Sequence, residues 1–198
     1  MFNNLETTPF VVFDIETTGL DYRMGNQVIE LAAQKIVDHK IVDQFHFLIN
    51  PTVPIEDGAY NVHGLSNLFL STQGKLAQEV FPQFLDFTKD TILVGHNILN
   101  FDIPFLNNDL KRLSFSPLEN LVVDTLIMAR KILPSLPNHK LGTVATHFGV
   151  DPTGAHRAMV DVEMNKKVFL KMLTAYVTKL KEEEQRHSHA PSTSSRLF

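Results

Sequence analysis

Two carboxylates interrupt an apolar segment near the start of the chain. Asp14 and Glu16 lie in FVVFDIE, residues 10–16, whose other members are apolar, mostly β-branched or aromatic. Side chains two residues apart on a strand point to the same face, so these carboxylates repel each other unless a cation lies between them. Such oxygen ligands suit a hard divalent ion, Mg²⁺ or Mn²⁺. Taken alone, the pair fits an ordinary acidic cluster at a strand end equally well.

A third carboxylate follows a second apolar segment. Asp102 lies in GHNILNFDIPFL, directly after the expected strand 91–95 and at the start of an expected helix. Capping of that helix by Asn97 or Asn100 would explain the polar patch without any chemistry. Asp102 nevertheless comes close to the edge of the sheet, where it can converge with the first two acids.

A histidine and a fourth acid occur together in GAHRAMVD. Within one helix His156 and Asp161 would be roughly 140° apart, at about 100° per residue. They share a site more easily if His156 lies on a loop, which Gly154 favours, and Asp161 in the early turns of the following helix. A single histidine is more often a surface or capping residue. Beside a metal held by oxygen ligands, however, it is a natural general base.

The elements around these residues are expected to form one α/β domain over residues 1–181. The apolar patterns predict strands at 10–16, 28–37, 41–49, 91–95 and 121–124, and helices at 76–89, 101–113, 126–133, 141–148 and 158–181. The first three strands form an antiparallel meander, and later strands alternate with helices, which indicates a mixed central sheet. Residues 182–198 are polar and rich in serine, which predicts a flexible tail.

Composition restricts the class of protein. The 198 residues suffice for one domain, and the absence of cysteine excludes disulfides and thiolate catalysis. No apolar run matches a membrane span and MFNNLETTPF is not a signal peptide, so a soluble, cytoplasmic protein with no membrane partner is expected. A net charge of −4 does not fit binding of nucleic acid by bulk charge. Bound metal ions would have to supply positive charge at such a contact.

Five segments in order resemble one family. FDIETTGL, HGL, GHNILNFDIPFL, VDTL and HRAMVD are similar to the motifs of the DEDDh 3′–5′ exonuclease superfamily. Within it they most resemble the proofreading epsilon subunit and the exonuclease domain of bacterial DNA polymerase III. The resemblance covers residues 9–175, and several motifs matched in order are more specific than any one of them. It implies a ribonuclease-H-like fold, with a mixed five-stranded sheet flanked by helices.

The resemblance also implies catalytic roles. Two divalent metal ions, Mg²⁺ or Mn²⁺, would bind, with Asp14 bridging them. Glu16 and Asp161 would complete the site of one ion, and Asp102 would hold the other largely through water. His156 would take the proton from the attacking water. All five family positions are filled in this sequence.

Contacts to the 3′-terminal nucleotide are implied for six further residues. These are Thr17, Thr18, Gly19, Leu20, His63 and Phe101. His96 and Asn97 match a family motif and are expected to organise the site. Some relatives carry an acid that contacts the terminal sugar where this chain has Gly58, with Glu56 and Asp57 just upstream. This departure leaves the choice between DNA and RNA open.

The expected function is hydrolysis of single-stranded 3′ ends, with DNA favoured, in proofreading or repair. A DNA polymerase subunit is an expected partner. One alternative is an RNA-trimming enzyme similar to oligoribonuclease or RNase T. Another is a non-catalytic binding module on the same fold. The end of the tail, Leu197-Phe198, resembles the peptide that docks on the sliding clamp, although Ser194 replaces the usual glutamine.

Overall fold

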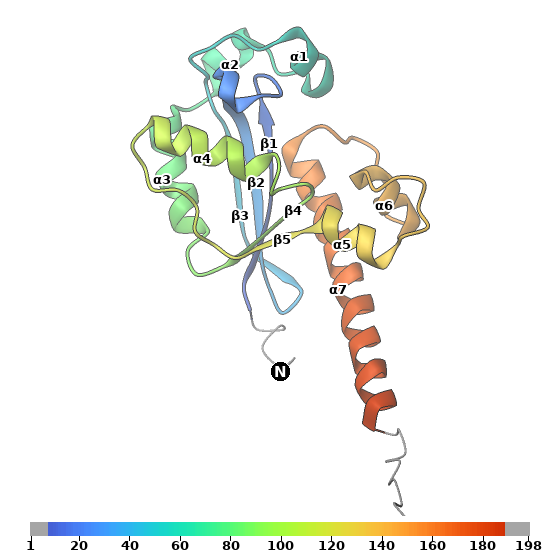
Figure 1. Cartoon of the computed structure of the whole chain (residues 1–198). Coiled ribbons are helices and arrows are strands. Elements are labelled where there is room, and N and C mark those ends of the chain that lie inside the picture. The colour runs from blue at the N-terminus through green and yellow to red at the C-terminus, as the bar shows by residue number, and fades with distance from the viewer. Residues whose placement is uncertain (1–7, 189–198) are drawn as a thin grey trace, which may run out of the picture.

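A mixed five-stranded sheet forms the centre of the protein, seen here in a computed structural model that describes residues 8–188 (Figure 1). The strands are β1 (Phe10–Thr17), β2 (Val28–Val37), β3 (Lys40–Leu48), β4 (Ile92–Gly95) and β5 (Val122–Asp124). Their order is β3-β2-β1-β4-β5. The first three strands pair antiparallel, whereas β4 and β5 run parallel to β1. The predicted meander and mixed sheet are therefore confirmed.

Helices occupy the connections between and after the strands. They are a short 3₁₀ helix η1 (Tyr22–Met24), α1 (Asp57–His63), α2 (Asn67–Gln73), α3 (Ala77–Phe87), α4 (Asp102–Arg112), α5 (Thr125–Ile132), α6 (Leu141–His147) and α7 (Ala158–Ser188). Within the described residues, no helix is long and apolar enough to cross a membrane. Helices α1 and α2, beyond the end of β1 in Figure 1, were not predicted. Each has only seven residues and one that is buried, so neither shows an apolar period.

The last helix is longer than the sequence pattern predicted. Helix α7 ends at Ser188 rather than near residue 181, and it extends well away from the sheet (Figure 1). Residues 181–186 read KEEEQR, which are good helix formers and continue the helix without an apolar period. Residues 182–188 are thus helical, which corrects the predicted start of the tail. Only 189–198 of that tail lie outside the described residues.

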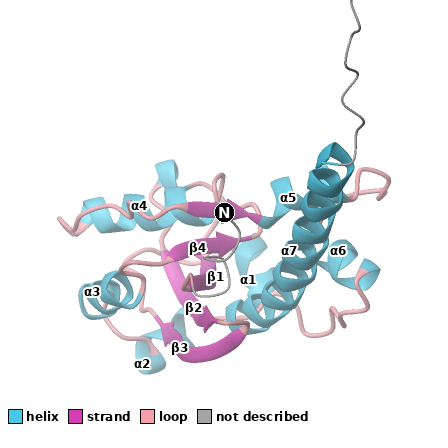
Figure 2. Ribbon diagram, turned by 90° about the horizontal axis from the view of Figure 1, so that it is seen from below, coloured by secondary structure: helices cyan, strands magenta, loops and turns pink. Residues whose placement is uncertain are grey.

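Helices cover both faces of the sheet (Figure 2). Under α3 and α4 the core is rich in phenylalanine: Phe13, Phe45, Phe81, Phe84 and Phe105. On the opposite face α7 packs against β1, and Phe169 meets Phe10 edge-on with ring centroids 5.2 Å apart. Because side chains alternate along a strand, Asp14 and Glu16 continue the row of Phe10 and Val12 on the α7 face. The fold thereby directs both acids towards α7.

Candidate active site

Three carboxylates converge where β1 meets the start of α7. Asp14 and Glu16 come from β1, and Asp161 comes from the first turn of α7. A carboxylate oxygen from each lies within 4.8 Å of the oxygens from the other two. Three hard oxygen donors at this spacing suit a divalent cation. Asp102, at the start of α4 and 3% exposed, lies outside this tight group but is close enough to affect Asp14 electrostatically.

Burial makes ionisation of these acids unfavourable. Burial and then the charge of Asp102 raise the pKa of Asp14 well above its ordinary value. Burial and neighbouring carboxylates, Glu30 first among them, raise the pKa of Glu16 to about 8. Burial likewise raises the pKa of Asp102 to about 8, and it raises that of Asp161. Without a cation the cluster therefore retains protons, and a divalent ion would displace them.

The loop before α7 holds His156 beside the cluster. The helix begins at Ala158, so His156 lies on the loop and Asp161 in the first turn, as the spacing predicted. The His156 backbone N–H donates to Asp161 Oδ2 at 2.8 Å. His156 is exposed and has a left-handed φ of 72°, which is uncommon for a residue other than glycine. Its ring is therefore open to solvent, and His156 lies close enough to Asp161 to affect that carboxyl electrostatically.

The loop that precedes Asp102 is braced from the neighbouring strand. Asp124, at the end of β5, accepts a hydrogen bond from the Asn97 amide at 3.1 Å and caps α5. His96 Nε2 donates to the main-chain carbonyl of His139 at 2.9 Å. His96 and Asn97 thus hold the loop through internal bonds, which agrees with an organising role. In the sequence, Asp124 stood out only as part of the VDTL motif. Its position as the N-cap of α5 identifies it as a brace.

The loop after β1 presents backbone and one apolar side chain. Thr17 Oγ1 donates to the Gly19 carbonyl at 2.6 Å, and Thr18 Oγ1 donates to Asn26 Oδ1 at 2.9 Å. Both threonine side chains are buried, so their hydroxyls bond within the protein. Leu20 is 81% exposed. A nucleotide at this loop would meet main-chain groups and the Leu20 side chain.

Two other predicted contact residues lie partly inside the protein. His63, at the end of α1, is 6% exposed, and its Nδ1 accepts from the Leu65 amide at 3.0 Å. Its Nε2 is buried, and a hydrogen bond with the Thr17 main chain partly offsets the lowering of the ring's pKa by burial. Phe101 is half-buried against Phe105, with ring centroids 4.8 Å apart. His63 is therefore held inside the protein, and its Nε2 is not open to solvent.

An acid does approach the loop after β1, although not from position 58. A Cβ added to Gly19 would lie 2.5 Å from the Glu56 carboxyl group, and Glu56 Oε1 accepts from Asn26 Nδ2 at 2.9 Å. A Cβ at Gly58 would meet nothing within 4 Å. Glu56 thus places a carboxylate beside the loop after β1, against which the terminal nucleotide was expected.

Glu30 is a fifth acid at the cluster, and it was missed from the sequence. It lies directly opposite Glu16 in the register of β1 and β2 and is 0% exposed. The signal was present, because an acid in VIELAA breaks an apolar strand as Asp14 does. Its two side-chain partners, His46 and Arg157, come from other elements.

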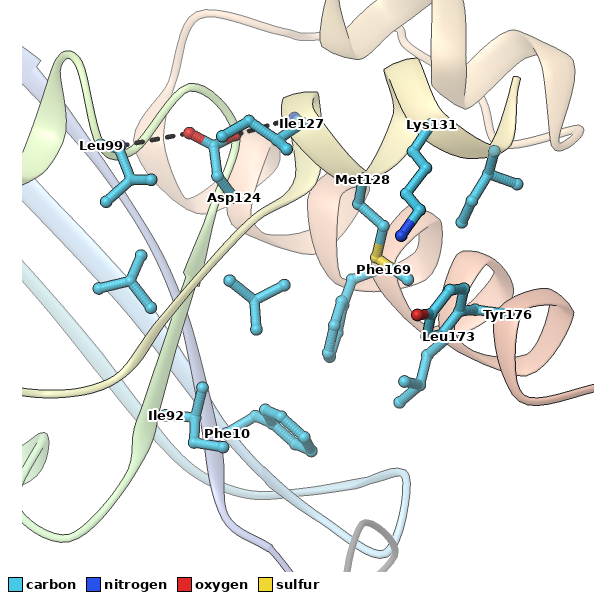
Figure 3. Close-up of a pocket in the computed structure, with 13 residues that line it drawn as sticks. Phe10, Ile92, Leu99, Asp124, Ile127, Met128, Lys131, Phe169, Leu173 and Tyr176 are labelled. Carbon is cyan, nitrogen blue, oxygen red and sulfur yellow. Dashed lines mark hydrogen bonds between the residues drawn. The ribbon is translucent and has the colours of Figure 1, made fainter. Parts of the chain in front are cut away.

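A separate apolar pocket of about 440 Å³ lies between the sheet edge, α5 and α7 (Figure 3). Phe10, Met128 and Tyr176 are among its lining residues. Asp124, at one end, accepts bonds from the amides of Leu99 and Ile127 at 3.3 and 3.4 Å. That carboxylate is engaged by the main chain, so the pocket lacks the converging acids of the β1–α7 site.

The exonuclease family model (RNase_T) matches residues 11–169 of this sequence. The chain belongs to this exonuclease family. PolC-type DNA polymerase III of Caldanaerobacter subterraneus is 41% identical over 164 residues, 83% of this chain and 11% of that protein. The Pediococcus pentosaceus protein of the same name is 37% identical over 155 residues, 78% of this chain and 10% of that protein. The chain spans about a tenth of the length of these relatives.

Solved structures agree on the fold of this exonuclease domain. Escherichia coli exonuclease I in complex with a dA16 oligonucleotide has a TM-score of 0.74 at 19% identity, covering 81% of this chain and 40% of that one. The zinc-bound exonuclease I–ssDNA complex has a TM-score of 0.78 at 19% identity, over 91% and 43% of the two chains. The fold is therefore the ribonuclease-H-like exonuclease fold, as the resemblance implied.

Proposed function

We propose that this domain is a metal-dependent 3′–5′ exonuclease that hydrolyses single-stranded DNA from its 3′ end to nucleoside 5′-monophosphates. The observation that carries the proposal is the convergence of Asp14, Glu16 and Asp161 within 4.8 Å, with Asp102 beside them. Membership of the exonuclease family supports this reading of the acids. Relatives named as DNA polymerases favour DNA as the substrate.

The donor set fits divalent metal ions, because all four side chains offer carboxylate oxygens. We infer two ions, Mg²⁺ or Mn²⁺, with Asp14 shared between them. Glu16 and Asp161 would complete the site of one ion, and Asp102 would serve the other. Such ions, when bound, activate a water and stabilise the departing 3′ oxygen.

His156 is proposed as the general base. A neutral imidazole can accept the proton of the attacking water, and the ring is exposed on the loop before α7. The bond from the His156 amide to Asp161 fixes the backbone of this residue relative to one of the proposed metal ligands. The loop and the ligand are thereby held as one unit.

The 3′-terminal nucleotide is proposed to lie against the loop after β1. The exposed Leu20 and the half-buried Phe101 offer apolar surface for an unstacked base. Main-chain groups of residues 17–19 would meet the phosphate, and the buried His63 would support this loop from below through the Thr17 main chain. Glu56, beside Gly19, is placed to approach the terminal sugar.

The test uses 5′-labelled and 3′-labelled single-stranded DNA and short RNA, with Mg²⁺ or Mn²⁺ and with EDTA. We expect 5′-labelled DNA to shorten stepwise and the 3′ label to be released first as a mononucleotide. Faster hydrolysis of RNA would instead favour an RNA-trimming enzyme. Metal binding without hydrolysis of any substrate would favour a non-catalytic binding module.

Partners follow from the same proposal. The relatives suggest proofreading or repair beside a DNA polymerase subunit. Docking of Leu197-Phe198 on a sliding clamp also stays a prediction, because these residues lie outside the described part of the chain. A peptide of residues 188–198 should bind the clamp with micromolar affinity, about −8 kcal/mol, and the L197A/F198A peptide should not. Equal signals from both peptides would exclude docking.

A further inference from the structure

Glu30 lies beside the acidic cluster but is bonded quite differently. Its Oε1 receives His46 Nε2 at 2.7 Å and Arg157 Nη2 at 3.1 Å. Its Oε2 receives Arg157 Nε at 3.2 Å and lies 3.5 Å from the Ala158 amide. Both oxygens of this fully buried carboxylate are therefore occupied by donors from β3 and from the start of α7.

These partners set Glu30 apart from Glu16, its neighbour across the strands. Burial raises the pKa of Glu30, but the hydrogen bonds from His46 and Arg157 outweigh it and lower that pKa to about 2. The pKa of Glu16, by contrast, is raised to about 8. Glu30 thus stays ionised without a metal and directs its charge at Arg157, so its place in the site is not that of a fifth metal ligand.

Besides His46, Glu30 contacts the two residues that follow His156. Arg157 binds it through two nitrogens, and Ala158, which is fully buried, begins α7. On the other side, the His156 amide donates to Asp161 at 2.8 Å. His156 therefore has an anchor on each side, which explains how a non-glycine residue keeps a left-handed φ of 72°.

We propose that Glu30 and Arg157 are positioning residues that hold the His156 loop against the metal-binding carboxylates. The proposal rests on the proposed role of His156 as general base. Bidentate pairing suits this task, because the planar guanidinium fixes orientation as well as distance. The two residues act through His156 and contact neither the water nor the metal ions.

A competing assignment for Arg157 is a direct contact to the phosphate of the substrate. Its side chain is 45% exposed, so a substrate can reach it. The two assignments differ kinetically, because a phosphate contact acts whether or not His156 is present. A positioning residue loses its effect once the group that it positions is removed.

The experiment is a double-mutant cycle on the full chain with labelled single-stranded DNA. Arg157→Gln and Glu30→Gln should each lower kcat about 10- to 100-fold with KM changed less than about threefold. In the His156→Ala background the same changes should alter kcat by less than about twofold. Arg157→Lys, which keeps the charge but not the fork, should recover part of the lost rate. A full further loss in the His156→Ala background, or a rise in KM alone, would overturn the proposal in favour of a phosphate contact.

Arg112→Gln is the matched control, because Arg112 also pairs with a buried carboxylate, Asp109 at 2.9 Å, away from the site. It should leave kcat unchanged.

The His156 amide resonance in NMR spectra of the free protein gives a second measurement that needs no turnover. It should move in Glu30→Gln and Arg157→Gln and stay in place in Arg112→Gln. An unmoved resonance in both variants would overturn the positioning role even if nuclease activity is confirmed, and a shift would support it even if no substrate is cleaved.

Discussion

At the scale of single residues, the acidic cluster combines burial with like charge. Glu16 has a pKa of about 8 against an ordinary value of 4.5, and Asp102 one of about 8 against 3.8. These shifts share one principal cause, the removal of carboxylates from water. A cation reverses the effect, because it makes the ionised form the favoured one.

The raised pKa of Glu16 predicts how stability depends on pH without metal. Between about 4.5 and about 8 the folded state retains a proton that the unfolded state has lost, so the free energy of unfolding falls as pH rises through this range. In EDTA, the melting temperature of the wild type should drop from pH 6 to pH 8 by more than that of Glu16→Gln. Added Mg²⁺ should raise it more at pH 8. Identical pH profiles for the two proteins in EDTA would contradict the expectation.

His156 leads to a prediction about rate. If it removes the proton from the attacking water, His156→Ala should lower kcat at least ~100-fold at neutral pH, and less at high pH where hydroxide is available. Rates on labelled DNA between pH 6 and pH 9.5 test this, and a near-normal rate for His156→Ala at pH 7 would mean that another group is the base.

At the scale of elements, β1 joins the core to the site. Its alternate residues Val11, Phe13 and Ile15 enter the core below α3 and α4, while Phe10 and Val12 pack under α7. Packing on both faces fixes the strand and its register. The position of Asp14 relative to α7 is consequently set by hydrophobic contacts as well as by the site.

Phe169 is the contact that tests this coupling. It is 1% exposed and packs on Phe10, so Phe169→Ala should lower the free energy of unfolding by about 3–5 kcal/mol through loss of burial and formation of a cavity. Leu68→Ala, at a position 78% exposed, is the control and should change it by less than about 0.5 kcal/mol. Urea denaturation followed by circular dichroism measures both. A small effect of Phe169→Ala would mean that α7 is not held in this way.

Strands and long helices were predictable because their residues repeat an apolar period. Strand β2 covers Val28–Val37, the predicted range, and α4 differs from its prediction by one residue at each end. Helices α1 and α2 have mainly exposed residues, and the end of α7 depends on helix propensity, so periodicity could not reveal them. The apolar period therefore predicts elements that pack on the sheet, and it misses elements that lie outside the core.

At the scale of the whole molecule, the fold brings together residues far apart in the chain. Asp14 and Asp161 are on the first strand and the last helix, and the parallel β1–β4 pairing brings the loop with Asp102 to the same end. The four site acids carry a formal charge of −4, which equals the net charge of the chain, so the remaining residues are electrically balanced. Electrostatic attraction of DNA therefore depends on bound cations.

The acids could be identified from the sequence because each interrupts an apolar pattern or belongs to a family motif. The contacts around these acids could not be predicted. Arg157 and Glu30, for example, are 127 residues apart and meet only through the packing of α7 on β2. For the same reason the approach of Glu56 to Gly19 could not be predicted. Contacts between distant segments require the fold itself.

The central claim is that the converging carboxylates hold metal ions that drive hydrolysis from the 3′ end. Its most direct test compares the wild type with Asp14→Asn on a 5′-labelled single-stranded DNA, in Mg²⁺ and in excess EDTA. We expect stepwise shortening only for the wild type in Mg²⁺. Asp14→Asn should fold and, without metal, melt at or above the wild-type temperature, because one repelling carboxylate is gone. Full activity of the wild type in EDTA, or of Asp14→Asn in Mg²⁺, would contradict the claim.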